Sequence, residues 1–90
     1  LALPGSGDAS ITAYGITKTA LNAVTIKMAK DFRSSRILVN AVCPGVTASR
    51  PGAGFGRPAA ESAKGLVWAA TLPDDGPTGF FFRDGKQLPW

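Results

Sequence analysis

Tyr14 and Lys18 are the two side chains of this sequence whose spacing suggests acid–base chemistry. They stand four residues apart in a stretch, residues 13–32, that is typical of a helix, so both should rise from one helical face. A phenol has a reference pKa of about 10 and is a poor proton donor near neutrality. A neighbouring ammonium stabilises the phenolate and lowers the pKa of the phenol. The pair therefore predicts a proton-transfer site.

The helix that carries this pair is predicted from a broad apolar stripe. Ser10 or Thr12 can cap its first turn. Gly15, beside Tyr14, serves either a close approach by another group or simple helix packing. The stripe repeats at spacings of three and four and consists of Ile16, Ala20, Leu21, Ala23, Val24, Met28 and Phe32. It either covers a sheet or packs against a second copy of the helix.

A strand and the turn after it are expected to place the ligand site. Residues 37–43 form a nearly continuous apolar run that stops at Pro44 and Gly45, which is typical of a strand buried on both faces of a parallel sheet. In doubly wound sheets, ligands bind beyond the carboxyl ends of the strands. The glycine-rich loop over residues 46–57, which we expect to be unstructured, therefore belongs to the site.

The rest of the chain predicts one more helix and one more strand. Pro58 opens a helix over residues 59–72, residues 78–83 form a final strand, and residues 84–86 form a turn into the tail. Trp68 is expected in the core, and Trp90 either caps the sheet or lines the substrate cleft, with the cap favoured. The order helix, strand, helix, strand predicts an α/β fold.

Composition limits the chain to one small domain and excludes several classes of function. The net charge of +4 comes from basic residues scattered singly along the chain, which argues against nucleic-acid binding. One cysteine, Cys43, and no histidine leave no metal cluster to propose, no internal disulfide and no activated thiol. No apolar run approaches the roughly 20 residues that cross a membrane. We therefore expect a cytoplasmic protein without membrane or nucleic-acid partners.

Two motifs at a characteristic separation resemble the short-chain dehydrogenase/reductase family. The first runs from Tyr14 through Lys18 to Asn22, and the second runs from Val39 to Gly45. The tail over residues 72–86 resembles the carbonyl-reductase-like branch of that family, which uses NADPH. The resemblance implies that residues 1–90 are one partial domain, the C-terminal portion of a doubly wound Rossmann-type parallel sheet.

The family's chemistry can be carried over to the matching residues. The resemblance implies that Tyr14 donates a proton to the oxygen of a small-molecule carbonyl substrate, and that Lys18 lowers the Tyr14 pKa and binds the nicotinamide ribose. It implies NADP(H) as cofactor in preference to NAD(H). Pro44 and Gly45 match the turn beside the nicotinamide.

The loop after this turn matches the family less closely. Val46 matches the position whose backbone amide meets the nicotinamide carboxamide. Ser49 stands where the family usually has a threonine that contacts the cofactor, and the hydroxyl is kept. Arg50 departs from the acidic residue that is common beside it.

The family's cofactor-binding half has no counterpart in these residues. Members begin with a strand and a G-x-x-x-G-x-G turn that binds the pyrophosphate, and the partner serine would lie at or before Leu1. We therefore expect a fragment of a longer reductase of ketones or aldehydes, inactive by itself. The alternative is a non-catalytic truncated remnant or packing fragment, in which Tyr14 and Lys18 are ordinary helix residues.

The predicted sheet leaves one strand edge bare. The strand over residues 37–43 has a single predicted neighbour, residues 78–82, and an open apolar edge recruits other chains. The chain alone should therefore be unstable or self-associating. A homo-oligomer would form through the helix over residues 13–32 or through the exposed strand edge.

Overall fold

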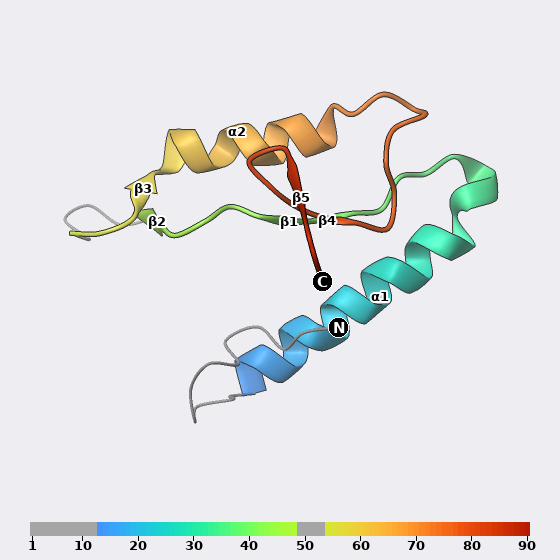
Figure 1. Ribbon diagram of the computed structural model, residues 1–90, viewed down its shortest axis with the longest axis horizontal. Helices are drawn as coiled ribbons and strands as arrows, with labels where there is room; N and C mark the ends of the chain where they lie inside the picture. Colours follow the sequence, from blue (N-terminus) through green and yellow to red (C-terminus); the bar gives the residue numbers. More distant parts are fainter. Residues whose placement is uncertain (1–12, 49–53) are drawn as a thin grey trace.

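The computed structural model describes residues 13–48 and 54–90 of a flat molecule with principal extents of 45 × 31 × 17 Å. Helices α1 and α2 lie on opposite sides of a small sheet, so the predicted α/β class is confirmed (Figure 1). The helices are α1 (Ala13–Asp31) and α2 (Ala59–Ala70), with a short 3-10 turn at Arg33–Ser35. The strands are β1 (Ala41–Cys43), β2 (Thr47–Ala48), β3 (Arg57–Pro58), β4 (Phe81–Arg83) and β5 (Lys86–Leu88).

Helix α1 follows the predicted range and ends one residue early. Lys30 lies in its last turn, where a positive charge suits the negative end of the helix dipole. The chain leaves the helix through Arg36, which has a left-handed φ of 58° and donates its backbone N–H to the Arg33 carbonyl at 3.0 Å. The caps predicted at Ser10 or Thr12 lie outside the described residues.

The apolar stripe of α1 stays exposed, from 57% at Ile16 to 38% at Phe32. The residues that α1 buries are small: Gly15, Thr25 and Ala29. Of the two uses predicted for the stripe, covering the chain's own sheet is therefore wrong. Neither α1 nor any other helix in the described part of the chain is long and apolar enough to cross a bilayer.

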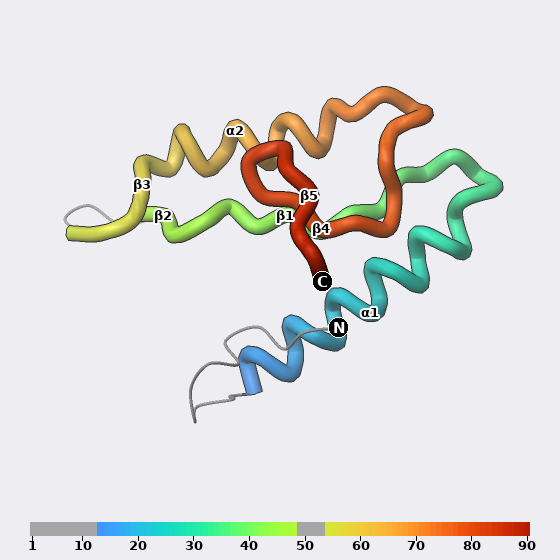
Figure 2. The backbone as a smooth tube through the Cα atoms, in the orientation of Figure 1, coloured from blue at the N-terminus to red at the C-terminus, as the bar shows by residue number. Residues whose placement is uncertain are grey.

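The main sheet has the order β1-β4-β5. Strands β1 and β4 are parallel, with Val42 opposite Phe82, although the two strands are far apart in the sequence. Figure 2 shows how the chain leaves α2 and returns to run beside β1. Among the described residues no strand pairs with the other edge of β1, so the prediction of a bare edge is confirmed for this part of the chain.

The predicted turn over residues 84–86 is tighter than expected and begins an additional strand. Asp84 and Gly85 both have positive φ, 53° and 74°, as the two central residues of a type I′ hairpin require. The chain therefore reverses within two residues, and β5 pairs antiparallel with β4. The sheet is therefore mixed: its predicted parallel portion is the β1–β4 pair, and β5 adds an antiparallel strand that was not predicted.

Strand β1 is shorter and less buried than the predicted strand over residues 37–43. Before Ala41, one backbone bond of the ladder remains, from Gly79 N–H to the Val39 carbonyl at 2.8 Å, and side chains make the other contacts. Val39 N–H donates to Thr78 Oγ1 at 2.9 Å, and Asn40 Nδ2 donates to the Pro77 carbonyl at 2.9 Å. Asn40 Oδ1 also accepts a hydrogen bond from Phe80 N–H at 3.1 Å. These side-chain bonds delay regular pairing, so the final strand also starts late. The whole of β1 is only half-buried, which corrects the prediction of a strand buried on both faces.

The prediction that the loop over residues 46–57 is unstructured is wrong at its two ends. Its two described ends form the parallel pair β2 and β3, in which Thr47 lies opposite Arg57. The Arg57 N–H donates to the Val46 carbonyl at 3.0 Å. The loop therefore returns to its own starting point, at the end of β1.

Helix α2 begins directly after Pro58 and ends two residues before the predicted residue 72. It packs against the sheet, where the Trp68 ring meets the Phe82 ring edge-on with centroids 5.1 Å apart. Phe82 is 5% exposed and Ala29 is 2% exposed, and they are the buried apolar residues of the described chain. The core is small and lies around Phe82, and Trp68 belongs to it as predicted.

Candidate active site

Tyr14 and Lys18 lie in the first two turns of α1 and approach each other as their spacing predicts. The Lys18 Nζ lies 5.5 Å from the centroid of the Tyr14 ring, a cation–π distance. The Tyr14 side chain is 67% exposed, so its hydroxyl is accessible to a ligand. The predicted juxtaposition on one helical face is therefore confirmed.

Both side chains border a cleft of about 540 Å³ between α1 and the sheet. This volume lies within the range of about 300–1,000 Å³ that is usual for small-molecule sites. The residues that line the cleft are Tyr14, Lys18, Leu21, Asn22 and Thr25 of α1, Asn40 to Pro44 around β1, Phe81 of β4, and Pro89 and Trp90 of the tail. The helix thus shares the cleft with the carboxyl end of β1, where the sequence placed the ligand site.

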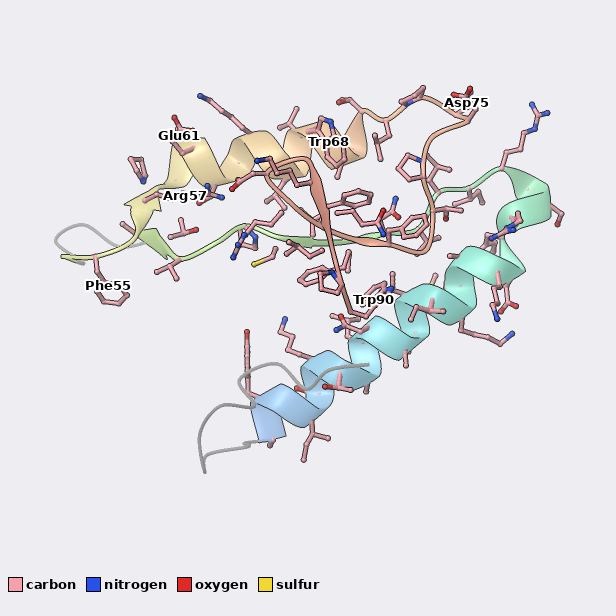
Figure 3. All side chains as sticks on the ribbon, viewed as in Figure 1. Phe55, Arg57, Glu61, Trp68, Asp75 and Trp90 are labelled. Carbon is pink, nitrogen blue, oxygen red and sulfur yellow. The ribbon has the colours of Figure 1, made fainter. Side chains whose placement is uncertain are left out.

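Trp90 both caps the sheet and lines the cleft, so the two alternatives proposed for it hold together. Its ring stacks on Phe81 with centroids 5.7 Å apart and an interplanar angle of 16°, and its Nε1 donates to the Gly79 carbonyl at 3.3 Å. In Figure 3 the labelled Trp90 lies between the sheet and α1. The carboxyl-terminal tail therefore forms one apolar wall of the cleft.

The turn after β1 contains residues that were predicted to contact the cofactor. Of these, Pro44 lines the cleft, and Gly45 and Val46 do not. Pro44 lines the cleft together with Tyr14 and Lys18. Gly45 has a φ of 78°, which favours glycine, and its N–H donates to the Cys43 Sγ at 3.4 Å. Gly45 and Val46 continue past the cleft wall, and Val46 is 66% exposed.

Ser49 and its neighbour Arg50 lie outside the described residues. The cofactor contact predicted for Ser49 therefore remains a prediction.

Arg57 is the residue of this region that sequence reasoning missed. Its guanidinium makes a two-pronged ion pair with Asp84, with N–O distances of 2.7 and 3.1 Å, and also donates to the Pro44 carbonyl. Hydrogen bonding to Asp84 raises the pKa of Arg57, and the same bond lowers the pKa of Asp84. The two residues are 27 positions apart, and no local pattern connects them. In the sequence, the one signal was the place of Arg57 at the end of the loop that follows the Pro44–Gly45 turn.

Comparison with known proteins agrees with the fold. A family model described as enoyl-(acyl carrier protein) reductase matches residues 5–72. Salutaridine reductase from Papaver bracteatum is 44% identical over 71 residues, which cover 78% of this chain and 22% of that protein. The chain belongs to the short-chain dehydrogenase/reductase family.

Two further members of the short-chain dehydrogenase/reductase family extend this agreement. Carbonyl reductase [NADPH] 1 from Mus musculus is 36% identical over 86 residues, which cover 88% of this chain and 31% of that protein. The structure of salutaridine reductase from Papaver somniferum matches with a TM-score of 0.71 and 39% identity, over 82% of this chain and 25% of that one. The predicted Rossmann-type portion is therefore confirmed, and the chain spans less than a third of the length of these relatives.

Proposed function

We propose that this chain is the C-terminal part of an NADP(H)-dependent oxidoreductase that reduces ketone or aldehyde groups. The proposal rests on one observation: Tyr14 and Lys18 line the same cleft as the carboxyl end of β1, with the Lys18 Nζ 5.5 Å from the centroid of the Tyr14 ring. A proton donor, a cation and the end of a parallel strand are the parts that this chain would contribute to carbonyl reduction. The substrate is a small molecule.

Each group has one task in the proposed reaction. Bound NADPH would supply the hydride that adds to the carbonyl carbon. The Tyr14 hydroxyl gives its proton to the carbonyl oxygen, which completes the alcohol and leaves a phenolate. The Lys18 ammonium stabilises that phenolate by charge and also binds the ribose of the cofactor.

The turn after β1 fits a nicotinamide placed beside Tyr14. Pro44 already lines the cleft, and Gly45 supplies the positive φ of 78° with which the chain turns directly after it. We assign Pro44, Gly45, Val46 and Ser49 to cofactor contacts. NADP(H) is preferred to NAD(H), because the similar protein from Mus musculus is named as a carbonyl reductase that uses NADPH. The unpaired Cys43 suits a cytoplasmic location.

The test of this function is Tyr14→Phe in the whole protein that carries this chain. The variant keeps the ring and loses the proton, so kcat with a ketone substrate should fall by roughly 10²–10⁴-fold while the NADPH Kd changes little. Thr71→Val is the matched control, because it removes a hydroxyl at the end of α2, outside the cleft. Normal turnover in Tyr14→Phe would eliminate this mechanism.

A further inference from the structure

Arg57 joins three segments that are distant in the sequence. From β3 its guanidinium reaches the Pro44 carbonyl at the end of β1 and the Asp84 carboxylate in the β4–β5 hairpin. Figure 3 shows Arg57 directly before the first turn of α2. The side chain is 31% exposed, so part of this contact is shielded from water.

The guanidinium also lies against Gly45. A Cβ built on Gly45 would stand 3.1–3.3 Å from three guanidinium atoms of Arg57, closer than ordinary contact. The planar group therefore occupies the space that a side chain at this position would need. It restricts the turn from one side while it binds the carbonyl of the preceding proline.

Two hydroxyls extend the hold on the same turn. Arg57 Nε donates to Ser62 Oγ at 3.2 Å, and Ser62 is 4% exposed. Ser62 Oγ lies 2.6 Å from Thr47 Oγ1, and Thr47 Oγ1 donates to the Gly45 carbonyl at 3.0 Å. The carbonyls of Pro44 and Gly45 are thus both held by one connected network that has Arg57 at its centre.

We propose that Arg57 is a positioning residue, which fixes the Pro44–Gly45 turn in the shape that presents its backbone to the nicotinamide. The inference rests on the proposed function for its cofactor, and goes beyond it in naming the residue that holds the turn. Arg57 acts through the turn and contacts neither the cleft nor the reacting groups. An arginine suits this task, because its rigid fork can bind a carboxylate with two bonds while a further N–H binds a carbonyl.

The other ion pairs of the described residues lack these features. Lys27–Asp31 and Lys64–Glu61 each join side chains 50–74% exposed, within one helix, through a single N–O contact. Neither reaches a carbonyl of the turn. Exposed ion pairs of this kind contribute little to the free energy of folding. Lys64→Gln is therefore a matched control: it removes one cation of an ion pair near Arg57 and leaves the turn intact.

The experiment uses the whole protein and two readouts in Arg57→Ala, Arg57→Lys and Lys64→Gln. Amide hydrogen exchange across residues 44–48 measures the turn itself, and should accelerate roughly tenfold or more in Arg57→Ala. The NADPH Kd should rise roughly tenfold in the same variant, with the KM of the carbonyl substrate nearly unchanged. Arg57→Lys should recover only part of either effect, since an ammonium has no fork. Lys64→Gln should match the unmodified protein.

The outcomes separate this inference from the proposed function. Unchanged exchange at residues 44–48 in Arg57→Ala would overturn it, as would an unchanged NADPH Kd in a variant that melts at a lower temperature, because Arg57 would then only stabilise the fold. Full recovery by Arg57→Lys would also overturn it. If the unmodified protein binds no NADPH, the proposed function fails and with it the cofactor part, while hydrogen exchange still decides whether Arg57 holds the turn.

Discussion

Among single residues, the pair Tyr14 and Lys18 on one turn of α1 is the most important feature of this protein. The regular geometry of α1 is enough to bring Tyr14 and Lys18 together. The distance of 5.5 Å from the Lys18 Nζ to the Tyr14 ring centroid follows from their spacing of four residues. The pair is exposed at the cleft, so its environment depends on what occupies that cleft. The pair is therefore set by local helix geometry, whereas its surroundings depend on what lies in the cleft.

Replacing Lys18 by Met should remove the cation and keep a side chain of similar length. We expect kcat/KM for carbonyl reduction to fall by at least roughly a hundredfold, because the phenolate left by proton transfer loses its counter-charge. Lys27→Met, on the same helix but outside the cleft, should leave the steady-state rate constants unchanged. Equal effects of the two substitutions would contradict a specific role for Lys18.

Asp84 should make the free energy of unfolding of the protein depend on pH in the acidic range. Its pKa is lowered in the folded state by the hydrogen bond from Arg57, so its stabilising effect is present above the unfolded-state pKa of about 4. That effect is lost as the pH falls from there through the lower folded-state pKa. The free energies of urea unfolding of the protein and of Asp84→Asn should therefore differ above about pH 5, and the difference should shrink as the pH falls through the lowered pKa of Asp84. A difference that is independent of pH would contradict this linkage.

At the scale of elements, side-chain hydrogen bonds decide where strands begin. The apolar run before Ala41 keeps one backbone bond, from Gly79 N–H to the Val39 carbonyl, while Asn40 bonds the backbone at Pro77 and Phe80 through its side chain. Thr78 does the same for Val39 from the other side. Polar side chains therefore hold the start of the β1–β4 pair, and the regular backbone ladder holds its centre.

Asn40→Ala should loosen the start of this parallel pair. The change leaves the Pro77 carbonyl and the Phe80 N–H without their partner, which costs about 1–2 kcal/mol of the free energy of unfolding. Chemical denaturation of the whole protein measures it. Gln87→Ala, at an exposed position of β5, is the control and should change the free energy by less than about 0.5 kcal/mol. A cost for Asn40→Ala no larger than the control would show that these bonds do not secure the pairing.

At the scale of the whole molecule, the chain is open for its size. Its accessible surface is 6393 Å², against about 5,000 Å² for a compact chain of this length, and its radius of gyration is 14.6 Å against about 12 Å. No large side chain among the described residues is fully buried. The edge of β1 and the stripe of α1 are both available for further contacts.

The 90-residue chain purified alone should therefore self-associate and bind no NADPH. Exposed apolar side chains on α1 and an unpaired strand edge favour association, while the residues contain no G-x-x-x-G-x-G turn for the pyrophosphate. Sedimentation velocity over a range of concentrations and calorimetric titration with NADPH measure the two properties. A stable monomer, or tight NADPH binding, would contradict these expectations. A non-catalytic packing fragment would be favoured if the whole protein also failed to reduce carbonyl compounds.

Local patterns of the sequence were enough for the helices, the approach of Tyr14 to Lys18, and the parallel pairing near Pro44. Helix periodicity and the proline and glycine stops act over a few residues, so they can be read without knowing the fold. The β4–β5 hairpin also had a local signal, the Asp84-Gly85 dipeptide, which predicts a two-residue turn.

Only the tertiary structure decided how the Pro44–Gly45 turn is held. Arg57, Pro44 and Asp84 come from three separate segments, and the β2–β3 pairing and the β1–β4 register bring them together. Contacts between residues 27 positions apart depend on chain closure and strand register, which no local preference encodes. The same reason explains the exposed stripe of α1: its apolar spacing predicts a buried face, but the fold determines which partner buries it.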